Sequence, residues 1–183
     1  DMYHKILNEA IEELKETEFR ELFQEELARD NSYVRECVIE TDLEVMLPDS
    51  YVSSGTERLV LYKELNDLTT EEELDAFRTR LIDRFGPIPQ ATEELIRTIT
   101  LRRMAREVAI ERLVLKQERM LCQFVSNQDN PFYKSAKFMK MIHYVQTHPQ
   151  VARLKETAGH LTLTFAPVGR IEEAIRLLIG LTK

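Results

Sequence analysis

Apolar residues recur every three or four positions through most of the first 110 residues, the spacing that places them on one face of a helix. The first stripe of this kind predicts a long amphipathic helix over Tyr3–Leu27. Three further helices are predicted at about 55–66, 70–85 and 89–108. Because the periodicity is present from the first residues onward, we interpret the chain as a segment of a longer protein.

The helix boundaries carry their own signals. Ser54–Glu57 and Thr70–Glu73 each place a hydroxyl residue three positions before a glutamate, the arrangement of a capping box at a helix start. Gly86 stands where a helix end favours a left-handed residue, and Pro87 prevents the helix over 70–85 from continuing. The apolar face of that helix is predicted to be buried and contains Leu74, Phe77, Leu81, Ile82 and Phe85.

Strand patterns begin at Val38–Leu47, where apolar and polar residues alternate in part before Pro48. Beyond residue 110, alternation predicts two hairpins, each followed by a helix. The four strands are predicted at 113–115, 120–125, 151–155 and 160–165, and the two helices at about 131–146 and 169–182. Asn130 before Pro131 is a strong helix start, since asparagine caps well and proline is favoured at the first helical position.

These elements predict an α+β fold, with a helical N-terminal half followed by a mixed half of two β-β-α units that pack as a small sheet with helices. We expect a connecting helical region at 1–30, a strand plus helical subdomain at 31–110 and an α+β subdomain at 111–183. A chain of 183 residues can bury one substantial core or two small ones. We expect one compact domain overall.

The composition is that of a globular protein, with 43% hydrophobic and 31% charged residues. No apolar run approaches the roughly 20 residues of a membrane span, and no signal-peptide pattern is present, so we expect a cytoplasmic protein. Cys37 and Cys122 lack a C-x-x-C partner. Two free thiols are the favoured interpretation, although the sequence leaves a disulfide between them open.

The net charge of −7 hides a polarity along the chain. Residues 1–30 hold ten acids against four bases, whereas residues 97–140 hold ten bases against four acids. This asymmetry fits an electrostatic docking face, a nucleic-acid contact, or two halves that attract each other. A pI near 5.3 argues against DNA as the main partner.

The residue patterns of catalytic sites are missing. The five glycines are isolated, so no phosphate-binding loop is formed, and His143 and His148 lack an acidic third ligand at a familiar spacing. No serine stands in a nucleophile-elbow setting. We therefore expect no catalytic residues, no cofactor and no metal in this chain.

One basic stripe deserves a separate interpretation. Lys134, Lys137 and Lys140 recur every three residues near one face of the helix predicted at 131–146. They are the candidate nucleic-acid contact, since such a row can follow a phosphate backbone. A solvated helix face is the favoured interpretation.

Several short segments, in their order and spacing, resemble a known family. They are Leu43–Pro48 followed by Tyr51, Glu57–Leu59, Leu61–Lys63, Glu72–Leu74, the run Leu81–Pro89 (LIDRFGPIP), and Arg102, Arg103 and Ala105. Together they resemble the C-terminal domain of bacterial transcription-repair coupling factors. The match is strongest before about Lys116.

The resemblance implies a regulatory part of an ATP-dependent DNA translocase that removes stalled RNA polymerase and recruits excision repair. In this family a UvrB-like module binds the damage-recognition protein UvrA, and the C-terminal domain packs on that module and masks it. The implied function is therefore that of a non-catalytic, autoinhibitory clamp. The alternatives are an accessory module that contacts nucleic acid or polymerase, and an enzyme whose site the linear sequence hides.

The resemblance also implies which residues form the clamp. Asp83 stands where the family places an acid facing basic residues of the masked module, but Arg80 stands where the family often has glutamate. Either the opposing surface carries a compensating acid, or Glu72 and Glu73 take over the contact. The expected interdomain contact residues are Glu72, Glu73, Arg80, Asp83 and Arg84.

Overall fold

The computed structural model describes residues 32–183, and the helix expected over Tyr3–Leu27 lies outside them. The strands are β1 (Val38–Thr41), β2 (Ile110–Lys116), β3 (Arg119–Phe124), β4 (Ala152–Thr157) and β5 (His160–Phe165). The helices are α3 (Gly55–Asp67), α4 (Glu71–Phe85), α5 (Gln90–Glu107), the short 3₁₀ helix η1 (Pro131–Lys134), α6 (Ala136–Thr147) and α7 (Ile171–Leu181). The predicted α+β fold is confirmed.

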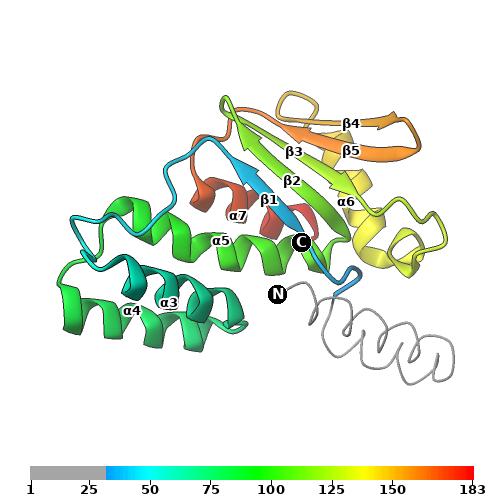
Figure 1. Cartoon of the computed structure of the whole chain (residues 1–183). Helices are drawn as coiled ribbons and strands as arrows, with labels where there is room; N and C mark the ends of the chain where they lie inside the picture. Colours follow the sequence, from blue (N-terminus) through cyan, green and yellow to red (C-terminus); the bar gives the residue numbers. More distant parts are fainter. Residues whose placement is uncertain (1–31) are drawn as a thin grey trace, which may run out of the picture.

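The five strands form one sheet in the order β1-β2-β3-β5-β4. β1 pairs in parallel with β2, and all other neighbours are antiparallel, so both predicted hairpins are present. Helices α5, α6 and α7 lie on one face of this sheet, and α3 and α4 form an antiparallel pair beside α5 (Figure 1).

The prediction of a single strand over Val38–Leu47 is wrong beyond Thr41. The carboxylate of Asp42 accepts a hydrogen bond from the backbone amide of Gln117 at 2.9 Å, which holds the end of β1 against the β2–β3 turn. The chain then leaves the sheet, and the amide of Met46 donates to the carbonyl of Ala91 at 3.2 Å. The segment after Thr41 therefore packs on the start of α5.

The predicted helix over 131–146 is also two elements. Asn130 caps η1 by accepting from the amide of Phe132 at 2.9 Å, as expected for an asparagine before proline. Ser135 has an extended backbone and therefore interrupts the helix. Its hydroxyl then caps α6 by accepting from the amide of Phe138 at 3.2 Å. A second local cap thus starts a second helix.

Ser54 and Thr70 cap α3 and α4 as predicted, accepting from the amides of Glu57 and Glu73 at 3.2 and 3.1 Å. The second half of each capping box differs from the prediction. The carboxylate of Glu73 accepts from the hydroxyls of Thr69 and Thr70, and Glu57 instead pairs with an arginine of α4.

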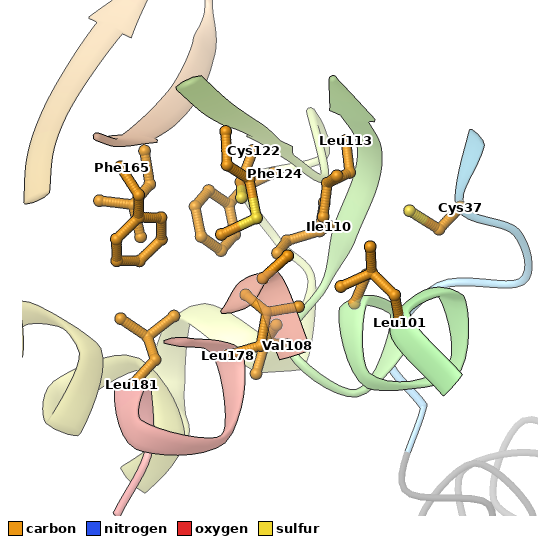
Figure 2. Packing of buried hydrophobic residues seen from close by; sticks show 14 of the residues in the cluster. Cys37, Leu101, Val108, Ile110, Leu113, Cys122, Phe124, Phe165, Leu178 and Leu181 are labelled. Atoms are coloured by element: carbon orange, nitrogen blue, oxygen red, sulfur yellow. The ribbon is translucent and has the colours of Figure 1, made fainter. Parts of the chain in front are cut away.

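The buried side chains form two clusters. The sheet cluster lies between the sheet and α5–α7, and Figure 2 shows part of it, with Phe124 and Phe165 facing Leu178 and Leu181 of α7. The helix-pair cluster fills the space between α3, α4 and α5 and contains Leu47, Val52, Leu61, Leu65, Leu74, Phe77, Leu81, Ile96 and Ile99. Helix α5 belongs to both, since Leu101 and Ala105 lie in the sheet cluster.

Cys37 and Cys122 are both free and buried in the sheet cluster, which confirms the interpretation as two free thiols (Figure 2). Burial raises the pKa of the Cys37 thiol to about 12 and raises the pKa of Cys122 as well. Because the thiolate is the reactive form, both side chains behave as small apolar core residues at neutral pH.

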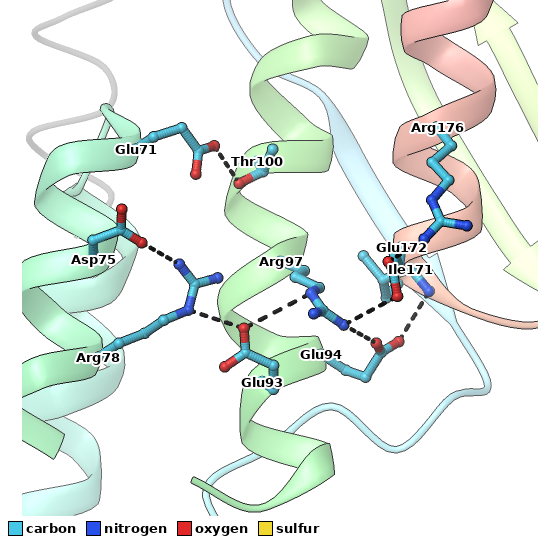
Figure 3. Close-up of polar contacts among 10 residues, drawn as sticks. All are labelled: Glu71, Asp75, Arg78, Glu93, Glu94, Arg97, Thr100, Ile171, Glu172 and Arg176. Atoms are coloured by element: carbon cyan, nitrogen blue, oxygen red, sulfur yellow. Dashed lines mark hydrogen bonds and ion pairs between the residues drawn. The ribbon is translucent and has the colours of Figure 1, made fainter. Parts of the chain in front are cut away.

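A buried carboxylate joins α5 to α7 (Figure 3). Glu94 is only 6% exposed, and its Oε2 accepts a hydrogen bond from the backbone amide of Ile171 at 2.9 Å. Arg170, which precedes α7, makes no side-chain cap, so Glu94 supplies the cap from another helix. Arg97 lies within 3.4 Å of Glu94 and 3.6 Å of Glu172, which completes the junction.

Candidate docking surface on the helix pair

Helix α4 is docked on two sides and open on a third. Leu74, Phe77 and Leu81 are buried in the helix-pair cluster. Toward α5, the guanidinium of Arg78 pairs with Glu93 at 2.9 Å, and Glu71 accepts from the hydroxyl of Thr100 at 2.7 Å (Figure 3). The open face contains Glu72, Ala76, Thr79 and Asp83, which are all exposed and follow one another at spacings of four, three and four residues.

The two arginines of the expected contact are engaged within the chain. Arg80 forms an ion pair with Glu64 of α3, and Arg84 forms one with Glu57. The guanidinium carbon of Arg84 also lies 4.8 Å from the centre of the Phe85 ring. Arg84 therefore does not form an exposed pair with its neighbour Asp83. Both arginines hold α3 against α4, so the charge of Arg80 is balanced locally.

The acids of the expected contact divide into two kinds. Glu73 is occupied by the threonine hydroxyls at the start of α4. Glu72 and Asp83 are exposed, and between residues 32 and 183 neither side chain has a recorded hydrogen bond or ion pair. The two carboxylates lie eleven residues apart on one helix face, about 16 Å along the axis. The open face of α4 thus presents two acids and no base.

Helix α3 carries two exposed apolar side chains. Leu59 and Val60 are 55% and 58% exposed. Val60 is one helical turn from both Glu57 and Glu64, which places it between the two ion pairs that join α3 to α4. Leu59 lies about 100° further around α3, away from α4, so we call Val60, together with the open face of α4, the helix-pair surface.

The predicted burial of Ile82 is wrong. Ile82 was expected on the buried face of α4, but its side chain is 51% exposed. Ile82 lies about 100° around the helix from Leu81, at the edge of the apolar stripe, where spacing alone does not decide burial.

Tyr51 holds the end of α4, a role that the sequence pattern did not predict. Its hydroxyl donates to the carbonyls of Gly86 and Leu81 at 2.8 and 3.2 Å, and its ring lies 5.7 Å from that of Phe85. Burial raises the pKa of Tyr51, which keeps the phenol protonated and able to donate. Gly86 adopts a φ of 89°, a backbone conformation that residues other than glycine rarely adopt. Tyr51 therefore fixes the turn that follows Asp83.

Tyr51→Phe is expected to lower the free energy of unfolding by about 1 kcal/mol, because two carbonyls lose their donor while the ring packing is kept. Amide exchange should accelerate at Gly86, whose amide closes the last turn of α4. Tyr33→Phe is the matched control, since within residues 32–183 the Tyr33 hydroxyl makes no hydrogen bond and its ring packs on Phe132. Equal destabilisation by both changes, measured by urea denaturation, would argue against the proposed role of Tyr51.

The structure separates the three lysines of the candidate nucleic-acid contact. Lys134 belongs to η1, whereas Lys137 and Lys140 belong to α6. Lys137 donates to the carbonyl of Glu107 at 3.3 Å and lies 5.6 Å from the centre of the Tyr33 ring. Lys134 and Lys140 are exposed. The three ammonium groups therefore do not form one continuous row on a single helix.

Arg102, Arg103 and Arg106 of α5 line a cleft of about 850 Å³ between α5 and the segment around β1. Arg102 donates to the side chain of Asn66 at 2.9 Å, and Arg103 pairs with Glu71 at 3.0 Å. Burial and neighbouring Arg106 lower the pKa of Arg102. These contacts join α5 to the last turn of α3 and to the first residue of α4.

Within residues 32–183, no group of three or more histidine, cysteine, aspartate or glutamate side chains is arranged to hold a metal ion. None of the helices in this part of the chain is long and apolar enough to cross a membrane. His148 stacks on Tyr144, with ring centres 4.0 Å apart.

The fold and the site define an α+β domain that presents a charged helix pair beside a five-stranded sheet covered by helices on one face. Residues 41–135, just over half of the chain, match the TRCF domain family. The chain belongs to this family.

Full-length proteins named transcription-repair-coupling factor are similar to this chain. The protein from Haemophilus influenzae is 31% identical over 153 residues, which are 83% of this chain and 12% of that protein. The Escherichia coli protein is 29% identical over 154 residues, with 84% and 12% covered. The Bacillus subtilis protein is 30% identical over 120 residues, with 65% and 9% covered. The chain spans about a tenth of the length of these relatives.

A solved structure agrees. The crystal structure of a C-terminal domain of transcription-repair coupling factor superposes with a TM-score of 0.63 and 18% identity. The match covers 80% of this chain and 94% of that domain, which establishes a shared fold. The resemblance that the sequence predicts is thereby confirmed.

Proposed function

We propose that this chain is a non-catalytic regulatory domain that docks on the UvrB-like module of a transcription-repair coupling factor and masks its UvrA-binding surface. The observation that supports this proposal best is the helix-pair surface. Within residues 32–183 its two carboxylates make no hydrogen bond or ion pair, and α3 adds one exposed apolar side chain, that of Val60. Such a surface suits a basic partner and a contact that is able to open.

The physics of the proposed clamp is that of a reversible interdomain contact. Interfaces of this kind bury about 600–1,500 Å² and are more polar than permanent ones. The open and closed states then form a two-state equilibrium, and RNA polymerase or nucleotide bound elsewhere in the translocase shifts it. UvrA binds the open state only, so closure lowers its apparent affinity.

The ion pairs of α3 and α4 give the clamp a rigid base. Arg80 and Arg84 are balanced by Glu64 and Glu57, and this leaves Asp83 as the charge at the C-terminal end of the surface. In this proposal Asp83 and Glu72 contact the basic module directly. Arg80 and Arg84 position α4 on α3, and Glu73 stabilises the start of α4.

Asp83→Ala in the full-length translocase is expected to raise its affinity for UvrA about tenfold or more without polymerase, because each 1.4 kcal/mol lost from docking shifts the closed-to-open ratio about tenfold. Titration calorimetry of full-length variants measures this change. Asp129→Ala, an exposed aspartate near the sheet, is the matched control and should leave the affinity unchanged. If removal of residues 50–183 raises the affinity and Asp83→Ala does not, the domain masks the module through other residues.

A charge exchange sharpens the test at position 80. Arg80→Glu alone places a second acid beside Glu64, whereas Arg80→Glu combined with Glu64→Arg keeps an ion pair between α3 and α4. Arg80→Glu adds an unbalanced acid one turn from Asp83 and should lower the affinity for UvrA if the opposing surface is basic. The exchange variant keeps the local charge balance and is the control, with an affinity close to that of the unaltered protein. An unchanged affinity in Arg80→Glu would place the basic partner elsewhere.

A further inference from the structure

A second surface, independent of the helix pair, lies on the sheet face opposite α5, α6 and α7 (Figure 1). Side chains alternate along each strand, so Leu113, Leu115 and Cys122 point into the sheet cluster and their neighbours point away from it. We call the face formed by these neighbours the outer sheet face. Its strand positions are Val38, Glu40, Arg112, Val114, Lys116, Arg119, Leu121, Gln123, Arg153, Lys155, Thr157, His160, Thr162 and Thr164.

The charge of the outer sheet face is strongly one-sided. Its bases are Arg112, Lys116, Arg119, Arg153 and Lys155, and its one acid at these positions is Glu40. Lys116 stands directly opposite Arg119 in the β2–β3 register, a like-charged pair that weakens a sheet. A face in contact with water alone would interleave both signs.

The single acid is already engaged. Glu40 pairs with Arg112 at 2.8 Å and with Lys116 at 3.8 Å. Arg119, Arg153 and Lys155 are exposed, and within residues 32–183 none of their side chains has a recorded ion pair. These three bases are therefore available to an external anion. Arg119 lies on the central strand β3, and Arg153 and Lys155 lie on the edge strand β4.

The register places the bases on both sides of a neutral centre. One row across the sheet consists of Val38, Arg112, Gln123, Thr162 and Lys155, so two neutral polar side chains separate Arg112 from Lys155. Three strand spacings separate these two bases, about 14 Å. In the adjacent row Leu121, which is 38% exposed, occupies the centre of the sheet, and Glu40 and Arg153 occupy the two ends.

We propose that the outer sheet face binds an acidic segment of a partner protein. Across the strands Arg119 lies about 12 Å from Arg153 and about 17 Å from Lys155, so carboxylates about 14 Å apart reach the available bases of both β3 and β4. That separation is about four residues in an extended chain or nine in a helix. An apolar residue between them would contact Leu121, and arginine is well suited to carboxylates. Nucleic acid fits less well, because the chain has a net charge of −7 and His160 is the one aromatic side chain at these strand positions, whereas single strands stack on several aromatic rings in succession.

The test uses the whole 183-residue chain and a fluorescent peptide with two pairs of aspartates separated by about four residues that include a leucine. Arg119→Gln with Arg153→Gln should weaken peptide binding about tenfold in anisotropy titrations at physiological salt. Lys134→Gln with Lys140→Gln removes the same charge from another surface and should change the affinity less than about twofold.

Each other outcome overturns the proposal. Absence of peptide binding, or equal weakening by the two double variants, would remove the case for a specific acidic site. Tighter binding of an oligothymidylate that is lost in Arg119→Gln with Arg153→Gln would assign the face to nucleic acid. Self-association of the chain, measured by analytical ultracentrifugation and abolished by the same variant, would assign it to a second copy. None of these results depends on masking of the UvrA-binding module.

Discussion

Phe77→Ala should lower the free energy of unfolding by about 3–5 kcal/mol, the usual cost of truncating a fully buried phenylalanine. Phe77 is 1% exposed at the centre of the helix-pair cluster, between Leu74 and Leu81. The loss combines the transfer of the ring out of the core with a cavity that two helices pinned by ion pairs cannot easily close. Urea denaturation, monitored by far-UV circular dichroism, measures this change in the free energy of unfolding.

The same variant tests whether the chain is one cooperative domain, as we propose. Helix α5 supplies Ile96 and Ile99 to the helix-pair cluster and Leu101 and Ala105 to the sheet cluster. Loss of one cluster should therefore destabilise the other, and amide exchange should accelerate together in α4 and in the sheet. Exchange that accelerates in α3 and α4 alone would show two independent units. Phe77→Leu is the matched control and should cost less than about 1.5 kcal/mol.

Local signals explain what the sequence predicts well. The starts of α3 and α4 are predicted within one residue because Ser54 and Thr70 bond to amides three residues away. The end of α4 is predicted at the correct residue because Gly86 and Pro87 act on the chain next to them. The alternation in β5 likewise reports a sheet with one buried face.

Long-range contacts explain what the sequence could not predict. β1 ends at Thr41 because Asp42 bonds to a turn 75 residues away, and no pattern near Asp42 reveals that partner. The role of Tyr51 depends on carbonyls 30 and 35 residues later in the chain. In the candidate site, the exposure of Asp83 follows from the helix period, whereas the pairing of Arg80 with Glu64 depends on how α3 and α4 pack.

Glu94→Ala is expected to lower the free energy of unfolding by about 2–3 kcal/mol. The change leaves the buried amide of Ile171 without its acceptor, and a buried unsatisfied donor costs about 1–3 kcal/mol. It also removes an anion from the N-terminus of α7, where negative charge stabilises a helix. Glu94→Gln keeps an acceptor without the charge and should cost about half as much.

Glu93→Ala is the matched control one residue earlier in α5. Glu93 pairs with Arg78 and Arg97 but is partly exposed, so its loss should cost less than about 1 kcal/mol. Amide exchange should accelerate in the first turn of α7 only after Glu94→Ala. Equal costs for the two alanine variants would contradict the capping role of Glu94.

The comparison of Glu94 with Asp83 separates stability from docking. Glu94 lies at the α5–α7 junction, whereas Asp83 lies on the open face of α4 and has no recorded partner between residues 32 and 183. Below the unfolding transition, Glu94→Ala should therefore weaken the fold while leaving the affinity of the full-length translocase for UvrA unchanged. Asp83→Ala should do the reverse, with a stability change within about 0.5 kcal/mol. If both variants raised the affinity in proportion to lost stability, release would reflect partial unfolding of the domain rather than a broken contact on the helix-pair surface.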